Sequence, residues 1–399
     1  MANVKLGLRQ NWKQFSLLVL INGFVGGMVG LERTILPQIA EVDFGIASKT
    51  SILSFILVFG VVKSISNYYA GAWSDKVGRK WLLVIGWLFA LPVAPILMVA
   101  NSWNLIVLAN VLLGVNQGLA WSSTVIMKID LVGEKNRGLA MGFNESAGYA
   151  SVALVAFATG WIAGEFGLRP YPFYLGIAIS AVGFIASLLF VRDTEHHVSK
   201  ASESSDVPLL NRIFSDTSWR HPNLGSITQA GLVNNLNDGL IWGLLPIILV
   251  DQGFSLSQTG LIVGIYPAVW GLGQAVTGKM ADHLPKKQIL FWGMLLQGLV
   301  LLGMSLTPGY ALLIILSTLL GVGTAVVYPT FLAAVADNTH PSQRARSIGI
   351  FRLWRDMGYA FGALITGILA DSFGSYFAVG GIGLLTCFSA AIIMVRMHK

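Results

Sequence analysis

The sequence contains one ten-residue pattern twice: Gly71-Ala-Trp-Ser-Asp75-Lys-Val-Gly78-Arg79-Lys80, and 207 residues later its degenerate copy Gly278-Lys-Met-Ala-Asp282-His-Leu-Pro-Lys286-Lys287. Two further matches have nearly the same offset. Gly30-Leu-Glu-Arg-Thr-Ile-Leu-Pro37 aligns with Gly239-Leu-Ile-Trp-Gly-Leu-Leu-Pro246, and residues 159–167 align with residues 366–374. Three matches at nearly one offset indicate an internal repeat, so we expect two similar halves.

The composition around these repeats is that of a membrane protein. Of the 399 residues, 54% are hydrophobic and 11% charged, and the mean hydropathy is +0.69. A soluble domain carries roughly 25% charged residues. The much lower charged fraction of this chain excludes most soluble enzymes, nucleic-acid binders and secreted scaffolds. The single cysteine, Cys387, excludes an intrachain disulfide and a cysteine-based metal site.

Hydrophobic stretches near the length needed to cross a bilayer predict twelve transmembrane helices. Of the 26 Lys and Arg residues, 20 fall in the termini and the even-numbered loops and two in the odd-numbered loops. This asymmetry predicts that both termini are cytoplasmic. The predicted spans are residues 15–37, 50–73, 81–100, 105–127, 138–163, 172–191, 226–249, 257–278, 288–306, 311–334, 347–369 and 375–395.

The one long connection, residues 192–224, mixes both charge signs with serine and histidine. Such a segment is typical of a solvated linker. We therefore expect an N-terminal six-helix bundle at residues 1–191, a cytoplasmic linker at 192–224, and a C-terminal six-helix bundle at 225–399.

The loop after the second span, with its copy after the eighth, resembles the signature of major facilitator superfamily transporters. The resemblance covers the whole chain through span count, repeat and loop position, and it implies an all-α membrane fold of two six-helix bundles with pseudo-two-fold symmetry. It also implies that spans 3, 6, 9 and 12 face lipid, and these four spans contain no Asp, Glu, Lys or Arg. By the same resemblance, a conformational latch would use Gly71, Asp75, Gly78, Arg79 and the repeat residue Asp282.

Charged residues inside the spans are costly, about 2.5 to 3.5 kcal/mol each at a helix centre, and therefore mark functional positions. The three charges of span 11 share one helix face, which predicts that Asp356 pairs with Arg352 and leaves Arg355 facing a pocket. Alternatively, the arginines pair with Glu145 and never touch a solute. The eight charges are balanced four to four: Glu32, Arg33, Lys63, Glu145, Asp238, Arg352, Arg355 and Asp356.

A guanidinium presents a planar fork of donors suited to oxyanions, and a buried lysine can bind an anion or release a proton. Burial favours the uncharged form of a carboxylate, which makes Glu32, Glu145 and Asp238 candidates for proton coupling. Static ion pairing is the alternative for each of them. Neutral residues of the same expected cavity either bind solute or hold helices together: Asn116, Gln117, Asn235, Tyr328, Trp121 and Trp242.

Together these features predict a secondary active transporter, proton-coupled, for a small polar anionic or zwitterionic solute bound by Arg355, Lys63 and Arg352. The alternative is a proton-driven exporter of drugs or lipophilic cations. Exporters of the resembled family commonly carry an arginine where Asn110 stands here, which weakens that alternative. No enzyme motif and no cofactor are expected. The expected partners are the solute, protons and the lipid bilayer, but no nucleic acid, and we expect a monomer in a bacterial inner membrane.

Overall fold

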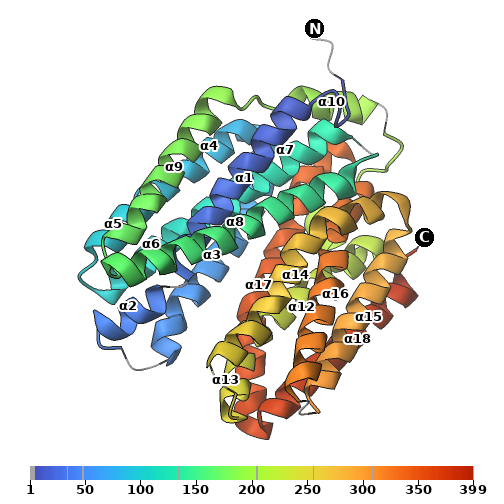
Figure 1. Cartoon of the computed structure of the whole chain (residues 1–399). Coiled ribbons are helices and arrows are strands. Elements are labelled where there is room, and N and C mark those ends of the chain that lie inside the picture. The colour runs from blue at the N-terminus through green and yellow to red at the C-terminus, as the bar shows by residue number, and fades with distance from the viewer. Residues whose placement is uncertain are drawn as a thin grey trace. The chain divides into compact units, whose positions relative to one another are not determined.

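The computed structural model of the chain is all-helical over the residues that it describes: 5–33, 35–46, 49–133, 135–203, 205–254, 256–306 and 309–398. Two compact units form it (Figure 1). Unit 1 comprises Met1–Lys135 and Ala147–Asp206, and unit 2 comprises Asn136–Ser146 and Val207–Lys399. The first residues of the fifth span thus belong to unit 2, and the expected linker is shared between the units.

The helices follow the predicted spans closely, with short breaks inside spans 1, 3 and 7. The expected linker is not only a loop, since it contains α10, α11 and η2. Up to residue 203 the elements are α1 (Trp12–Arg33), α2 (Leu36–Val42), α3 (Lys49–Val77), α4 (Arg79–Ala90), α5 (Val93–Val99), α6 (Trp103–Asn116), the π-helical η1 (Gln117–Trp121), α7 (Ser122–Val132), α8 (Arg137–Phe166), α9 (Tyr171–Phe190) and α10 (Glu195–Glu203).

The remaining elements all lie in unit 2. They are α11 (Ile213–Ser215), the π-helical η2 (Asp216–Arg220), α12 (Pro222–Gly243), α13 (Leu245–Asp251), α14 (Leu256–His283), α15 (Lys286–Met304), α16 (Tyr310–Asp337), α17 (Pro341–Phe373) and α18 (Ser375–Arg396).

Among the described residues, ten helical segments are long and apolar enough to cross a membrane. The two predicted spans outside this set, 7 and 11, form helices α12 and α17 at the expected positions. Their polar side chains lower their hydropathy, and these side chains are the ones gathered inside unit 2. A helix that buries polar groups against neighbouring helices does not need a uniformly apolar surface.

The internal repeat reappears in the packing within each unit. In unit 1, α3 packs on α6, α4 on α9, and α1 on α9; in unit 2, the corresponding α14 packs on α16, α15 on α18, and α12 on α18. Glycines bring spans 1 and 5 close together, because a Cβ on Gly26 would collide with the Gly148 backbone. A Cβ on Gly358 would likewise collide with the Leu232 backbone, between spans 7 and 11. The fold predicted from the repeat is confirmed.

Apolar side chains are exposed along the spans that were expected to face lipid. They include Leu88 on α4, Trp292 and Leu299 on α15, and two rows on α9 and α18. In a soluble protein such surfaces would drive association, whereas in a bilayer they meet lipid tails. The rows are Ile177, Val182, Ile185 and Leu189 on α9, and Leu384, Phe388 and Val395 on α18.

Candidate functional site

The structure divides the intramembrane charges between the two units and buries all of them except Arg33, which is half-buried. Unit 1 holds Glu32, Arg33 and Lys63. Unit 2 holds a larger cluster on α8, α12 and α17, which consists of Glu145, Asp238, Arg352, Arg355 and Asp356.

Within this cluster, Arg355 pairs with its own neighbour in sequence. Its Nε donates to Oδ1 of Asp356 over 2.7 Å, and the Nδ2 of Asn235 on α12 donates to the same oxygen over 3.4 Å. The guanidinium also lies 4.9 Å from the ring centre of Tyr328. The predicted pairing of Asp356 with Arg352 is wrong: Asp356 bonds Arg355 and Asn235, and no guanidinium nitrogen of Arg352 is hydrogen-bonded to a described residue.

Arg352 is the unusual member of the cluster. Its side chain is fully buried, and none of its three guanidinium nitrogens has a hydrogen-bond partner among the residues that the structure describes. The carboxylates of Glu145 and Asp356 lie within electrostatic range of it, as does Arg355. A buried charge without hydrogen bonds is costly, so the position is suited to an oxyanion that supplies acceptors.

A second buried carboxylate, Asp238 on α12, lies in a hydrogen-bonded chain. The phenol of Tyr266 donates to Asp238, and its oxygen lies 3.2 Å from Oγ1 of Thr324. From Tyr266 an aromatic row leads towards the arginines: its ring stacks on Trp270 with 5.9 Å between ring centres, and Trp270 lies 5.1 Å from Tyr328. The row connects the acid with the basic part of the cluster.

Our sequence reasoning missed Tyr266 and Thr324. The signal that indicates the first is the spacing of Tyr266, Trp270 and Gln274, which places three amphipathic side chains on one face of α14. All three are buried. Thr324 carries no signal of its own, because a lone threonine in an apolar helix usually bonds its own backbone.

The asparagines of α12 have different partners. Asn235 bonds Asp356, as described above, whereas Asn237 donates to Gln297 of α15 over 3.2 Å and accepts from Thr386 of α18 over 2.8 Å. The helix is regular through all of these residues, and its backbone breaks only at Leu244. Trp242 is 51% exposed near that break, so the structure does not bring it into the buried cluster.

The unit 1 cluster is built around Glu32, Lys63 and Phe59. Oε2 of Glu32 accepts a hydrogen bond from Asn110 over 3.2 Å. Asn110 is the residue at the position where many exporters of the resembled family carry an arginine. The ammonium of Lys63 lies 5.8 Å from the ring centre of Phe59 and 5.5 Å from that of Trp121, and Arg33 lies 5.5 Å from Phe59.

Asn116 and Gln117 hold helices together in unit 1. The Nδ2 of Asn116 donates to the backbone of Gly86 on α4 over 3.0 Å, and the Nε2 of Gln117 donates to that of Val25 on α1 over 2.7 Å. Both side chains are fully buried. These bonds favour the interpretation that the two residues hold helices together and do not bind solute, because their amide nitrogens already donate to backbone carbonyl oxygens.

The repeated loop residues form two distinct arrangements. In unit 1, Arg79 bonds Asp75 over 2.8 Å and Asp130 over 3.2 Å, and Gly78 supplies the positive φ of 89° at the start of α4. In unit 2, the carboxylate of Asp282 accepts hydrogen bonds from the backbone nitrogens of Gly138 and Leu139, over 2.7 and 2.9 Å. Asp282 thus caps α8 from another helix.

Asp130 lay outside the predicted span 4, which ended at residue 127. Helix α7 continues to Val132, and both Lys128 and Asp130 are buried in it. The Nζ of Lys128 donates to the backbone of Leu18 over 2.9 Å, and Oδ2 of Asp130 also accepts a hydrogen bond from Thr194 over 2.8 Å. The predicted span 4 therefore ended too early, and Lys128, which was counted as a loop residue, lies in the helix.

The family-level comparison settles what kind of protein carries these clusters. The family model described as Major Facilitator Superfamily matches residues 15–225 and 227–398. The chain belongs to the Major Facilitator Superfamily. It is therefore a multi-span membrane protein and a secondary transporter, not an enzyme.

Curated relatives cover nearly the whole chain at low identity. A protein of Proteus mirabilis named multidrug resistance protein MdtG is 26% identical over 376 residues, which is 91% of each chain. The MdtG protein of Salmonella paratyphi C is 24% identical over 375 residues, 91% of this chain and 90% of its own.

Solved structures share the fold at 15% identity. The human organic anion transporter MFSD10 covers 96% of this chain and 99% of its own with a TM-score of 0.77. A single-residue variant of the Escherichia coli fucose:proton symporter FucP covers 96% of this chain and 98% of its own with the same TM-score. At this identity the likeness establishes the fold alone.

Proposed function

We propose that this transporter carries a small organic or inorganic anion, or a zwitterion, and that the negative group of the solute binds Arg352. The observation that carries the proposal is the buried guanidinium of Arg352, whose nitrogens have no hydrogen-bond partner among the described residues. Arg355 is already bonded to Asp356, so its guanidinium is less available for direct bonds to the solute. It lies over the Tyr328 ring and adds a second positive charge that attracts an anion. A carboxylate, phosphate or similar oxyanion matches the guanidinium fork.

We further propose that transport is coupled to protons through Asp238, with Glu32 as the corresponding acid of unit 1. Asp238 is buried and accepts a hydrogen bond from Tyr266, and the ring contacts of Trp270 and Tyr328 lead from Tyr266 to Arg355. An acid near the arginines that bind the solute can take up or release a proton as their positive charge is neutralised or exposed by the anionic solute. Lys63 beside Trp121 is a candidate for a second contact with the solute.

The predicted topology places both termini in the cytoplasm, and the bacterial relatives favour an inner membrane. In this orientation Asp75, Arg79 and Asp282 lie at the cytoplasmic ends of their helices. We propose that these residues, with Gly71 and Gly78, act as a latch that is released in each transport cycle. The bonds of Asp282 to the start of α8 support this role.

A second candidate is the export of lipophilic cations or other drugs. It is favoured by the relatives named multidrug resistance protein, which match 91% of this chain. The acids Glu32 and Asp238, with the aromatic row of unit 2, would then serve a cationic solute.

Thermal stability of the purified protein distinguishes the two candidates. The panel contains carboxylates, inorganic oxyanions, amino acids and lipophilic cations, because a ligand at 100 times its Kd stabilises a protein by about 2.7 kcal/mol. We expect an anion or zwitterion to stabilise the wild-type protein, and we expect the Arg352→Gln variant to lose this stabilisation. The control is Arg192→Gln, which removes an exposed arginine just after α9 and is expected to keep the stabilisation. Stabilisation by lipophilic cations alone would favour drug export, and an Arg352→Gln protein with wild-type anion affinity would refute the Arg352 site.

A further inference from the structure

The segment just before α12 presents apolar side chains to its surroundings. Leu209 is 61% exposed, Phe214 38% and Trp219 49%. The rings of Phe214 and Trp219 lie 5.9 Å apart in an edge-to-face arrangement. Aromatic side chains of this kind are enriched where membrane proteins meet the headgroup region of a bilayer.

Hydrogen bonds hold this segment against three helices of unit 2. Thr228 of α12 donates to the backbone of Thr217 over 2.8 Å, and the indole of Trp354 on α17 donates to Ser218 over 2.9 Å. Arg396, the last residue of α18, donates to the backbone of Trp219. Only one residue separates the end of η2 from the start of α12, so in the predicted topology the exposed aromatic side chains belong to the cytoplasmic approach to the seventh span.

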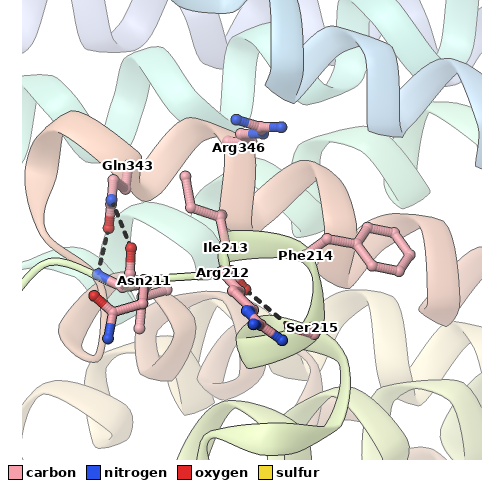
Figure 2. Close-up of a pocket in the computed structure, with 8 residues that line it drawn as sticks. Asn211, Arg212, Ile213, Phe214, Ser215, Gln343 and Arg346 are labelled. Atoms are coloured by element: carbon pink, nitrogen blue, oxygen red, sulfur yellow. Dashed lines mark hydrogen bonds between the residues drawn. The ribbon is translucent and has the colours of Figure 1, made fainter.

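Beside these side chains lies an open pocket of about 490 Å³, lined by residues 210–215 together with Gln343 and Arg346 (Figure 2). The amide of Gln343 fixes its wall, because it accepts a hydrogen bond from the Leu210 nitrogen over 2.8 Å and donates to the Leu210 carbonyl over 3.1 Å. Figure 2 shows Arg346 on α17 and Arg212 on the linker, with their side chains on different sides of the pocket-lining segment. Both arginines are exposed.

The charge of this pocket is positive. Its lining contains two arginines and no carboxylate among the described residues. The nearest acid along the linker, Asp216, accepts a hydrogen bond from the backbone nitrogen of Arg212 over 2.8 Å. Each of these guanidinium groups can offer parallel donors to the oxygens of a phosphodiester that reaches the pocket.

We propose that this pocket binds the phosphate of an anionic phospholipid, with Arg212 and Arg346 at the headgroup and Phe214 and Trp219 at the level of the lipid glycerol and upper acyl chains. The exposed aromatic side chains favour a lipid over free phosphate, since a soluble anion would gain nothing from them. The bound lipid would anchor the linker to the membrane surface. This proposal is independent of the solute that the protein carries.

The test uses the full-length protein in detergent, titrated with short-chain phosphatidylglycerol, with phosphatidylcholine and inorganic phosphate as separate probes. Binding is followed by native mass spectrometry and thermal stability. A cationic residue near an anionic membrane surface contributes roughly a fivefold gain in affinity. We therefore expect Arg212→Gln and Arg346→Gln each to weaken phosphatidylglycerol binding about fivefold, and the double variant roughly 25-fold.

The matched control is Arg192→Gln, which removes an exposed arginine outside the pocket and is expected to bind phosphatidylglycerol like the wild type. Trp219→Ser is expected to weaken lipid binding with no change in the response to phosphate. If the double variant fails to fold, the phosphatidylglycerol affinities of the two single variants are sufficient to test the proposal. Wild-type lipid affinity in both single variants, equal binding of phosphatidylcholine, or full competition by inorganic phosphate would each overturn the proposal.

Discussion

Arg355 and Asp356, adjacent residues of α17, form a buried ion pair in which Nε donates to Oδ1 over 2.7 Å. Asp356 bonds Arg355 and not Arg352, whose guanidinium nitrogens have no hydrogen-bond partner among the described residues. Removing one partner of a buried pair leaves the other charge uncompensated, which costs about 3 to 5 kcal/mol. We expect Asp356→Asn to lower the free energy of unfolding by about that amount, as measured by denaturant unfolding in detergent. In a double-mutant cycle with Arg355→Gln, a coupling energy near zero would contradict the pairing.

Asp238→Asn removes the proposed proton site while keeping an amide that can accept the Tyr266 hydrogen bond. We expect exchange of labelled solute between the two sides of a proteoliposome to continue, because it needs no net proton movement. Accumulation driven by a pH gradient is expected to be lost. The matched variant is Tyr266→Phe, which keeps the acid and is expected to retain accumulation. Gradient-driven accumulation in Asp238→Asn would exclude this acid as the coupling residue.

Asp282→Asn weakens the cap on the first turn of α8, since a neutral amide is a poorer acceptor for the Gly138 and Leu139 nitrogens. Loss of such a cap costs about 1 kcal/mol. We expect slower turnover in proteoliposomes with an unchanged Kd for the solute, because the change lies in the proposed latch and not at the proposed solute site. A changed Kd with unchanged turnover would contradict this assignment.

Gly183 of α9 lies against Trp87 of α4, and a Cβ there would collide with the indole ring. We expect Gly183→Ala to destabilise unit 1 by about 1 to 3 kcal/mol, the usual cost of overpacking. Gly164, with open space around it on α8, is the control. Gly164→Ala is expected to stabilise by up to about 1 kcal/mol through helix propensity. Thermal unfolding checks both, and equal effects would mean that the Trp87 contact is not tight.

His221 caps α12 by accepting a hydrogen bond from the Leu224 nitrogen at its Nδ1, over 3.3 Å. Burial lowers the pKa of His221 below its usual value, and nearby Asp216 only partly opposes this. The unfolded chain therefore binds a proton at this histidine more readily than the folded protein does. The contribution of His221 to the free energy of unfolding is complete above about pH 6.5 and declines as the pH falls below that value. We expect His221→Asn to lose this part of the pH dependence of the melting temperature, and an unaltered profile would refute it.

The sequence by itself determined the membrane environment, the twelve helical segments, the two-fold repeat and the residues worth attention. These follow from hydropathy, from the distribution of Lys and Arg, and from matches at nearly one offset, all of which are properties of the chain read in one dimension. Asn116, Gln117 and Asn235 were also marked as important from the sequence, because polar residues in a membrane span always need a partner.

Only the tertiary structure decided which partner each polar residue has. Spacing along α17 allowed Asp356 to reach Arg352, but the approach of Asn235 from α12 and the reach of Arg355 gave it different neighbours. Tyr266, Thr324 and Asp130 have their partners on helices distant in sequence. Hydrogen bonds act over about 3 Å, so the packing of glycine-lined helices selects the partners that come from different helices, and spacing along one helix does not predict them.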